Sequence, residues 1–419
     1  MSSIADPALA PAGAARVAWA DGQMPVLRSL RALLAVERPL EGLRVAACLH
    51  VTAETANLVR ALHAGGAEVA LCAANPLSTQ DDVCATLVEE GVADVSARRG
   101  ESLDEYASHV AALVASGPDI TLDDGADLLT VAHAAGRADG LLGATEETSA
   151  GLVRIRALAD AGELRCPVVA VNEAWTERLA NDRYGTGQSV MDGILRATNL
   201  LLAGRTVVVL GHGVTGQGIA QRARGAGARV VVCEVDPVRA LEACMEGFEV
   251  LPALRAAEVG EVLITATGSR GVLRREHLER LRDGAVLANA GHFDVEIDRL
   301  ALRELAVGGV REVLPLVEEH VLADGRKVNL LAEGRVVNLA AGQGHPPAAM
   351  DLSFALHALV VADLAARRGT LAAAVHAVPP GVDAEVARLK LASLGVRIDE
   401  QDEGQLAYRA GWGADAVLS

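Results

Sequence analysis

The chain has 419 residues, which is long enough for two or three domains with substantial hydrophobic cores. Hydrophobic residues make up 51% of it and aromatic residues only 2%, so we expect a folded globular protein with an aliphatic core. The formal net charge of −17 argues against a nucleic-acid partner, because the protein would repel a phosphate backbone.

The sequence lacks the usual signals for export or membrane insertion. Its N-terminus has no basic region followed by an apolar core, and we find no apolar run of membrane-spanning length. The six cysteines have no CxxC spacing, and several lie in apolar runs, which favours buried free thiols over disulfides or a zinc site. We therefore expect a cytoplasmic protein that binds neither a membrane nor a metal.

The first part of the chain alternates between predicted helices and strands. An amphipathic helix over 26–36 is followed by a strand over 43–49, a helix over 55–63 and a strand over 68–72. The alternation continues at 81–90, 103–116, 120–125, 140–143, 149–161 and 167–172. This pattern predicts a parallel α/β sheet, which binds ligands at the carboxyl ends of its strands. Polar residues at or just after such ends are His50, Asp123, Asp124, Glu146 and Glu147.

A glycine-rich turn lies in the middle of the chain. A connecting segment over 173–187 and a predicted helix over 188–202 precede a buried strand, which breaks into Gly211, Gly213 and Gly216. The glycines let the backbone approach a pyrophosphate, and the free N–H groups of the following helix receive its charge. The next predicted strand ends in Glu234, an acid placed to bind ribose hydroxyls and to repel a 2′-phosphate. The stretch therefore predicts NAD rather than NADP.

The remaining elements are predicted less regularly. Strands are expected over 261–267 and 285–289, and a polar cluster follows the second of them. We interpret residues 330–339 as a β-hairpin with Glu333 and Gly334 at its turn. A long apolar helix is predicted over 348–366, one further helical pattern begins at 382, and residues 409–419 are predicted to be a loose tail.

Several short stretches point to one family. They are CLHVTAET at 48–55, STQD at 78–81, LDDG at 122–125, EET at 146–148, DGILRAT at 192–198, GHFDVEID at 291–298, LAEGR at 331–335 and VNL at 337–339. Together with the glycine turn, they resemble adenosylhomocysteinase, which reversibly cleaves S-adenosylhomocysteine to adenosine and homocysteine. The resemblance runs from about Trp19 to about Leu394.

The resemblance implies an α/β fold of two doubly wound parallel-sheet domains, with an NAD-binding Rossmann domain inserted in a discontinuous substrate domain. We predict the substrate domain over 1–185 and 345–380, the NAD domain over 186–344, and a short C-terminal segment over 381–419. The resemblance also implies a homotetramer that acts on an adenine nucleoside or an S-adenosylhomocysteine-type small molecule.

The mechanism implied by the family is an elimination that depends on transient oxidation. Tightly held NAD⁺ oxidises the ribose 3′-hydroxyl, the ketone acidifies the 4′-hydrogen, a base removes this hydrogen, and the 5′-substituent leaves. Water then adds at C5′ and the ketone is reduced. Such chemistry needs acids and bases of adjustable pKa beside a desolvated sugar.

The family's roles can be carried onto matching positions of this sequence. His50 and Asp124 match the acid/base pair near C4′ and C5′, and Glu147 matches the carboxylate at the ribose hydroxyls. His292 matches the histidine at the sugar, and His345 matches the gate histidine near the adenine. The other matches are the adenine contacts Thr52 and Glu54, and the NAD contacts Thr148, Ser149, Gly211, Gly213, Val214, Gly216, Glu234, Thr267 and Asn338.

One segment departs from the family pattern, which has a Lys, an Asp four residues later and then an Asn, placed to take the 3′-hydroxyl proton. Aligned without gaps, this sequence has Glu177, Asn181 and Asp182 at those positions. A one-residue slip would instead pair Arg178 with Asp182 at helical spacing, but Arg is a poor proton acceptor because its pKa is too high. A nearby family cysteine is Thr186 here.

The C-terminus departs as well. The family's tail carries a Lys and a Tyr that reach the NAD of a neighbouring subunit, whereas here no Lys or Tyr follows Tyr408. The chain's two lysines, Lys327 and Lys390, match neither of the missing family lysines. We therefore expect NAD to be held more loosely, or to exchange.

Three functions remain open at this point. The altered proton-transfer residues beside a retained elimination cluster favour a repurposed enzyme, in which a group other than homocysteine leaves, for example water in a nucleoside dehydratase. The alternative is a genuine S-adenosylhomocysteine hydrolase. A further alternative is a non-catalytic NAD-binding regulator, which fits the missing Lys but not the retained acid/base residues.

Overall fold

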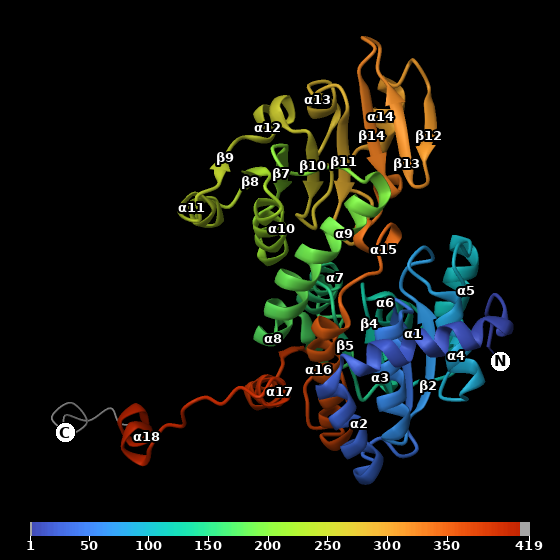
Figure 1. Cartoon of the computed structure of the whole chain (residues 1–419). Coiled ribbons are helices and arrows are strands. Elements are labelled where there is room, and N and C mark those ends of the chain that lie inside the picture. Colours follow the sequence, from blue (N-terminus) through green and yellow to red (C-terminus); the bar gives the residue numbers. More distant parts are fainter. Residues whose placement is uncertain (1, 411–419) are drawn as a thin grey trace.

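The computed structural model describes residues 2–410, which form two sheets with helices on both faces (Figure 1). Every strand pair of the first sheet is parallel, in the order β15-β6-β5-β4-β1-β2-β3. Its strands are β1 (Arg44–Leu49), β2 (Glu68–Ala73), β3 (Asp94–Ser96), β4 (Ile120–Asp123), β5 (Gly143–Glu146), β6 (Val168–Ala170) and β15 (Val375–Ala377).

The second sheet has the order β12-β13-β14-β11-β10-β7-β8-β9 and is parallel from β14 to β9. The edge strand β12 is antiparallel to β13, and β13 is antiparallel to β14. Its strands are β7 (Thr206–Leu210), β8 (Arg229–Cys233), β9 (Glu249–Val250), β10 (Val262–Thr265), β11 (Ala285–Asn289), β12 (Val310–Leu314), β13 (Val317–Val321) and β14 (Lys327–Leu331). The expected pair of parallel α/β sheets is confirmed.

Alternate residues of the strands point to opposite faces, so each sheet has two cores. In the first sheet, Val45 and Leu49 pack with one set of helices, and Ala46 and Cys48 pack with another. The first set is α1 (Ala10–Gly22), α2 (Pro25–Glu37), α3 (Ala53–Ala64), α4 (Asp81–Glu89), α16 (Pro347–Ala366) and α17 (Pro380–Ser393). The second set is α5 (Leu103–Ala115), α6 (Asp127–Ala134) and α7 (Ser149–Asp160).

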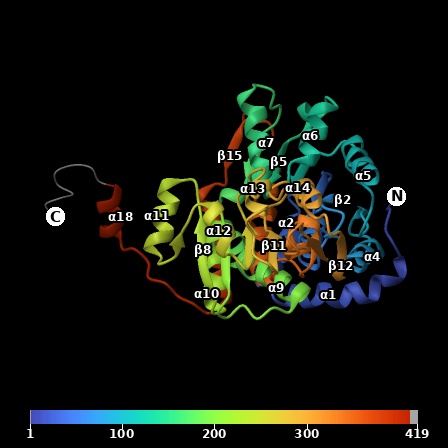
Figure 2. The same cartoon turned by 90° about the horizontal axis from the view of Figure 1, so that it is seen from above.

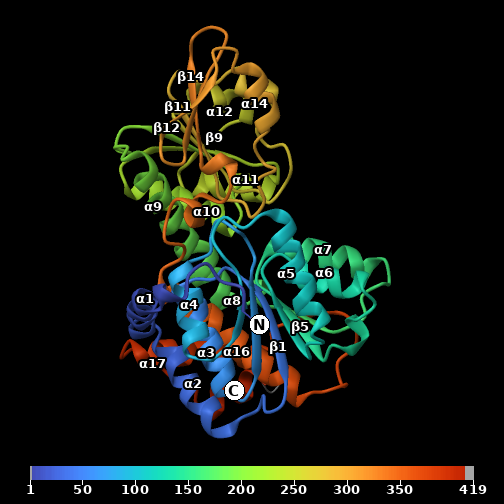
Figure 3. The same cartoon turned by 90° about the vertical axis from the view of Figure 1, so that its right-hand side faces the viewer.

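The same division occurs in the second sheet, where Val207 and Val209 face one core and Val208 and Leu210 face the other. The first core also contains residues of α9 (Thr186–Thr198), α10 (Val214–Gly225), α11 (Pro237–Met245) and α15 (Val337–Ala340). The second contains residues of α12 (Ala253–Val259), α13 (Arg275–Leu278) and α14 (Arg299–Leu305). In Figure 3 the second sheet and its helices lie above the first sheet and its helices.

The chain crosses between the sheets twice. The outward crossing is helical throughout, formed by α8 (Trp175–Glu177), a π-helix η4 (Arg178–Gly185) and α9. The return crossing contains the 3₁₀ turn η5 (Ala332–Gly334) and α15, and it leads into α16. We propose the domain boundaries at 185/186 and 344/345, which lie within these two crossings.

Helix α16 reaches the length and apolar composition of a membrane span, which the sequence analysis did not anticipate. However, 61% of its most apolar window is buried inside the molecule, where it packs against α2 and α3. Its Asp351 accepts hydrogen bonds from the N–H groups of Val26 and Leu27 at the start of α2 and pairs with Lys390 of α17 at 2.8 Å. These contacts are those of a core helix.

Three further expectations are corrected. The predicted hairpin over 330–339 is wrong, because the left-handed backbone of Ala332 and Glu333 turns the chain into α15, and Val337 packs on α9. The true antiparallel partner of β14 is β13. The segment 173–187, expected as a connection, is largely helical, and α9 ends at Thr198 rather than residue 202.

The chain ends of the described structure differ in their packing. The residues before the first predicted helix contain η1 (Pro7–Leu9) and helix α1, and short turns η2 (Ala138–Gly140) and η3 (Val171–Glu173) occur further along the chain. Helix α18 (Glu403–Ala410) lies apart from the body (Figure 2), and it lies beyond α17 in Figure 1. Residues 411–419, most of the predicted loose tail, lie outside the described residues.

Candidate active site

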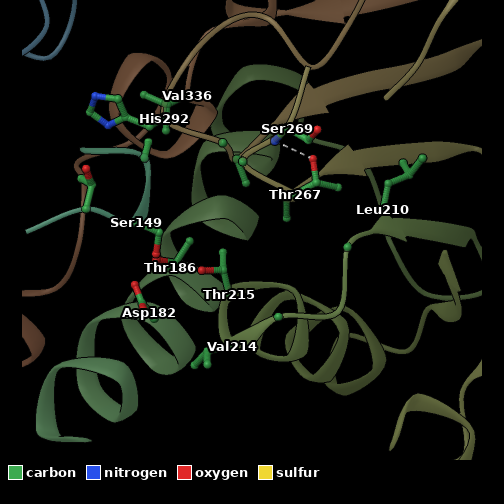
Figure 4. A pocket seen from close by; sticks show the side chains of 18 of the residues that line it. Ser149, Asp182, Thr186, Leu210, Val214, Thr215, Thr267, Ser269, His292 and Val336 are labelled. Carbon is green, nitrogen blue, oxygen red and sulfur yellow. Dashed lines mark hydrogen bonds between the residues drawn. The ribbon is translucent and has the colours of Figure 1, made fainter. Parts of the chain in front are cut away.

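A cavity of about 1240 Å³ lies where strand ends of the two sheets come together. Its lining includes residues at or just after β1, β4 and β5 of the first sheet, and β7, β8, β10 and β11 of the second. Ligands of open α/β sheets bind at such carboxyl ends. Figure 4 shows Ser149, Asp182 and Thr186 on one wall of this cavity, and Leu210, Thr267 and Ser269 on the other.

Nearly all the predicted site residues line this one cavity. The exceptions are Gly216, which lies inside the glycine turn, and Glu177, which is fully buried behind Asn181. The residues that line it are His50, Thr52, Glu54, Asp124, Glu147, Thr148, Ser149, Asn181, Asp182, Gly211, Gly213, Val214, Glu234, Thr267, His292, Asn338 and His345.

Asp124 lies between two histidines. Its Oδ2 is 3.3 Å from His50 Nε2, and its Oδ1 is 3.5 Å from His292 Nδ1. Gly125 makes room for this approach, since a Cβ there would lie 2.9 Å from His292 Nε2. The ligand atoms of the three side chains lie within 4.8 Å of one another, so the geometry would also accept a metal cation, which the sequence analysis did not expect.

The loop that follows β2 orients His50. The Ser78 hydroxyl donates to the Asn75 carbonyl at 2.9 Å, so its oxygen accepts from His50 Nδ1 at 2.6 Å, and the network assigns the proton to that nitrogen. Burial lowers the pKa of His50, an effect that Asp124 opposes and His292 reinforces. His50 is therefore neutral near pH 7, with Nε2 turned toward Asp124.

Glu147 enters the cavity at the end of β5 and is held from helix α16. Its Oε1 accepts from Ser353 Oγ at 2.9 Å, and its Oε2 lies 3.6 Å from His357 Nε2. Burial raises the pKa of Glu147 well above its usual range, and the nearby carboxyl groups of Asp124 and Glu177 raise it further. This carboxyl group therefore binds a proton more strongly than an exposed glutamate does.

The segment that departs from the family pattern lies at the end of α8, which contains Glu177, and on the π-helix η4. Arg178, Asn181 and Asp182 line the cavity, and the buried Glu177 accepts a hydrogen bond from the Asn181 side-chain amide. Burial raises the pKa of Glu177 to about 8, and burial also raises the pKa of Asp182 to about 7 despite the opposing charge of Arg178. Both carboxyl groups therefore titrate close to neutral pH.

The glycine turn fits a dinucleotide. Gly211 has a φ of +104°, and a Cβ on Gly216 would lie 2.0 Å from the Gly211 carbonyl oxygen, so both positions require glycine. A Cβ on Gly213 would meet only an Arg239 nitrogen at 3.6 Å, which leaves open space in front of the turn. Helix α10 begins there without a side-chain cap, so its first N–H groups can face a pyrophosphate.

Glu234 directly follows β8, and its carboxylate lies beside the glycine turn. Its carboxylate accepts hydrogen bonds from the N–H groups of His212, Val235 and Asp236 at 2.7, 2.6 and 3.0 Å. Partial burial works to raise the pKa of Glu234, but these N–H groups outweigh it, and the pKa is lowered overall. An ionised acid at this place fits a ribose diol and excludes a 2′-phosphate.

The other predicted NAD contacts are held by short local bonds. Thr267 Oγ1 donates to Glu296 at 2.7 Å, and Thr148 Oγ1 donates to Glu146 at 2.9 Å. Ser149 Oγ donates to Asn172 at 2.8 Å. These side chains come from both sheets. They can therefore contact the same ligand together only while the two sheets keep this arrangement.

The predicted base-binding residues also line the cavity. Thr52 caps α3, and burial raises the pKa of Glu54, although bonds from Thr52 and its own backbone oppose this. His345 Nε2 lies 3.0 Å from Thr186 Oγ1 and 3.2 Å from Asn338 Nδ2. Burial lowers the pKa of His345 to about 4, so this ring is neutral.

Ser78, Ser353 and His357 support His50 and Glu147 but were not predicted as site residues. Ser353 and His357 lie four residues apart in a largely apolar helix, so they share one face. Two polar residues at that spacing in a largely apolar helix are the sequence signal from which they could have been identified.

Known proteins resemble this chain along its whole length. The S-adenosyl-L-homocysteine hydrolase profile matches residues 2–141, and the profile of that enzyme's NAD-binding domain matches residues 182–344. An adenosylhomocysteinase of Aquifex aeolicus is 51% identical, with 98% of each chain covered. An S-inosyl-L-homocysteine hydrolase of Methanopyrus kandleri is also 51% identical, over 98% of this chain and 97% of that one. An adenosylhomocysteinase of Saccharolobus solfataricus is 50% identical, with 98% of each chain covered.

Proposed function

This chain belongs to the S-adenosyl-L-homocysteine hydrolase family, with that family's NAD-binding domain, and from this premise we propose that it hydrolyses an S-nucleosyl-L-homocysteine. S-Adenosyl-L-homocysteine is the first candidate substrate. The observation that carries the proposal is one cavity lined by both the glycine turn and the His50–Asp124–His292 cluster. The names of the relatives support homocysteine as the leaving group over the different leaving group favoured by the sequence analysis.

In the proposed complex, the nucleoside lies with its base near Thr52, Glu54 and His345 and with its ribose beside Glu147 and His292. Bound NAD⁺ supplies reversible hydride transfer at the ribose C3′ carbon. The chain's own contribution is to hold the sugar, to exclude water and to exchange protons with O3′, C4′ and C5′. A buried carboxyl of raised pKa, such as Glu147, can both accept a hydroxyl proton and return it.

The elimination step needs one proton acceptor and one proton donor at the sugar. The C4′–H and C5′–S bonds break, a base takes the C4′ proton, and an acid protonates the departing sulfur. We assign this exchange to His50 and Asp124, which lie 3.3 Å apart and can pass a proton between them. The addition of water reverses the same proton movements with oxygen in place of sulfur. His292 positions Asp124 from the other side.

A second candidate function is a nucleoside dehydratase, in which a hydroxyl leaves C5′ and no water is added back. The observation that favours it is the altered segment 177–182. Asn181 and Asp182 line the cavity at positions where the family pattern has an Asp and an Asn, and the buried Glu177 stands where the pattern has a Lys. A different leaving group would explain why the proton-transfer residues changed while His50 and Asp124 remained.

Product analysis separates the candidates. We expect the purified protein with NAD to release homocysteine thiol from S-adenosyl-L-homocysteine, measured with a thiol reagent, and S-inosyl-L-homocysteine serves as the parallel substrate because of the relative of that name. A dehydrated nucleoside formed without thiol, identified by mass spectrometry, would replace the hydrolase by the dehydratase. The absence of any nicotinamide absorbance change with any adenosine analogue would instead support the non-catalytic regulator.

We also propose a homotetramer as the active form, as the family resemblance implies. Light scattering of the purified protein tests this assignment, and a monomer that is fully active would overturn it.

A further inference from the structure

Arg154 of α7 contacts a loop from each of the two sheets. Its Nη1 donates to the Gly125 carbonyl oxygen at 3.0 Å and to Asp127 Oδ1 at 3.0 Å, which ties it to the loop that carries Asp124. Its guanidinium carbon lies over the ring of Phe293, 4.5 Å from the ring centroid, and Phe293 belongs to the loop after β11. One side chain therefore joins the first sheet to the second beside the cavity.

Phe293 is the neighbour of His292 in space as well as in sequence. The two rings meet edge to face, with their centroids 4.6 Å apart and their planes at 88°. Asn289 at the end of β11 holds the backbone here, since its side-chain amide donates to the Phe293 carbonyl oxygen at 3.0 Å. A guanidinium group, a phenyl ring and an imidazole ring thus form a continuous series of contacts, and the last of them reaches Asp124.

This series supplies a restraint on His292 that Asp124 alone does not. Among the described residues, Asp124 gives the His292 ring its one polar contact, and the 3.5 Å separation is longer than the roughly 3.2 Å limit of ordinary N–H···O bonds. The ring also lies against Gly125, where an added Cβ would be 2.9 Å from His292 Nε2. Gly125 and Phe293 therefore both pack on this imidazole, and Arg154 holds both of them.

We propose that Arg154 is a positioning residue, which clamps Gly125 and Phe293 on His292 and thereby holds this imidazole at Asp124. The inference rests on the proposed function, because it assumes that His292 and Asp124 act on the sugar. Arg154 and Phe293 do not line the cavity, so any effect they have on the reaction passes through His292.

An arginine suits this place because of its shape. The planar guanidinium group can donate along its edge to Gly125 and Asp127 while one face lies on an aromatic ring, whereas the ammonium group of a lysine is a point charge. Asp127 is itself fixed by the Tyr106 hydroxyl, which donates to it at 2.5 Å. The Arg154 side chain is 44% exposed, so its ion pair with Asp127 contributes little to stability. Removal of Arg154 should therefore change the rate and leave the fold intact.

Kinetics of three variants test the positioning role. Arg154→Met keeps the length of the side chain but removes its charge and donors, and we expect kcat for thiol release from S-adenosyl-L-homocysteine to fall about 10–100-fold. KM, NAD affinity and melting temperature should change little, because the cavity lining is untouched. Arg154→Lys should recover part of the rate, since it keeps the charge. The double variant of Arg154→Met and Phe293→Leu should be no slower than the slower single variant, because both remove the same contact. Normal kcat in Arg154→Met, or losses that multiply in the double variant, would overturn the proposal.

Fluorine NMR tests the same contact without substrate. The chain has three phenylalanines, Phe248, Phe293 and Phe354, so labelling with 4-fluorophenylalanine gives three resonances, and Phe293→Leu identifies its own. Arg154→Met should move the Phe293 resonance alone. The matched control is Arg224→Met, because Arg224 lies 4.4 Å over the ring of Phe248. It should move only the Phe248 resonance and leave kcat unchanged.

The two measurements separate failure of the proposal from failure of the proposed function. A Phe293 resonance that stays in place in Arg154→Met would show that the clamp does not exist in solution, whatever the activity. If that resonance moves but the wild-type protein neither reduces its nicotinamide with adenosine nor releases thiol, the proposed function fails. The positioning role then fails with it, although the contact between the two sheets is real.

Discussion

At the scale of single residues, the most informative contact is Asp124 between His50 and His292. Asp124 lies 3.3 Å from His50 Nε2 and 3.5 Å from His292 Nδ1, so it is placed to exchange a proton with either ring. The adjacent acid Asp123, the last residue of β4, has other partners, since it accepts from the N–H groups of Leu128 and Leu129. One step along the chain therefore separates a structural acid from a reactive one.

The first prediction concerns this cluster. Asp124→Asn keeps the size of the side chain but cannot accept a proton, and His292→Ala removes one of the partners of Asp124. We expect each variant to lose about 10²–10⁴-fold in kcat for thiol release while its circular dichroism and melting temperature stay close to those of the wild type. Asp160→Asn, at an exposed acid that is the last residue of α7, is the control. Near-normal turnover in Asp124→Asn would refute the assigned role.

The second prediction concerns cofactor choice. Glu234→Gln removes the negative charge that repels a 2′-phosphate, and Arg239 lies in the same cavity wall. We expect NAD affinity to fall about tenfold and NADP affinity to rise, both measured by quenching of tryptophan fluorescence or by calorimetry. An unchanged preference for NAD would show that another group selects the cofactor.

At the scale of elements, the turn between β7 and α10 separates two uses of glycine. Gly216 is required by packing, because its added Cβ would lie 2.0 Å from a backbone oxygen. Gly213 is open toward the cavity, so its lack of a side chain serves only a ligand that approaches closely. The same motif therefore contains one glycine for the fold and one for the cofactor.

The third prediction compares these two positions. Gly216→Ala should lower the free energy of unfolding by about 1–3 kcal/mol and weaken NAD binding, since the turn must shift. Gly213→Ala should weaken NAD binding while the melting temperature of the NAD-free protein stays unchanged. Thermal unfolding and calorimetric titration of both variants check this. Equal destabilisation by both substitutions would contradict the distinction.

How much could be predicted differs between elements. The strands β1 and β2 were predicted within a residue, and so were the carboxyl ends of β7 and β8, because apolar runs end there at glycines or polar residues. The hairpin at 330–339 failed because Glu333 and Gly334 do form a turn, but the following valines are buried on α9, which local sequence does not show. The helical state of 178–185 was missed because its mean composition is polar and its irregular π geometry is set by packing against α10 and α16.

The candidate site was likewise predictable from the sequence in part only. Side chains at strand ends, such as His50 and Glu147, could be placed together because parallel strands end at one edge. Glu177 could be flagged from the sequence, but its burial behind Asn181 depends on the path of the π-helix. Ser353 and His357 come from a helix more than two hundred residues away from Glu147, and only the folded chain brings them to it.

At the scale of the whole molecule, the site concentrates buried ionisable groups in one place. Burial raises the pKa of Glu177 to about 8, and of Asp182 and Asp123 to about 7, whereas it lowers the pKa of His345 and His357 to about 4. The histidines add stability as pH rises through their unfolded pKa near 6.5, and this gain is complete above neutral pH. The carboxyl groups have raised pKa values in the folded state, so their contribution to the free energy of unfolding falls as pH rises.

The fourth prediction follows from these signs. The folded protein binds protons at Glu177 and Asp182 more tightly than the unfolded chain does, so their stabilisation is present at low pH and lost as pH rises through 7 and 8. We expect the free energy of unfolding, measured in urea without NAD, to fall by roughly 1–3 kcal/mol between about pH 6.5 and 8.5. Glu177→Gln should show a smaller fall, and an equal fall would exclude Glu177 as a contributor.

The two crossings of the chain have a consequence for the order in which the protein can be made. The second sheet is contiguous from β7 to β14, so it can form as soon as that stretch leaves the ribosome. The first sheet must wait, since Val168 of β6 pairs with Val375 of β15 and α16 covers its face only after the whole second sheet has been synthesised. Until then the growing chain exposes a strand edge and an apolar surface, so nascent molecules depend on rapid completion or on chaperones to avoid aggregation.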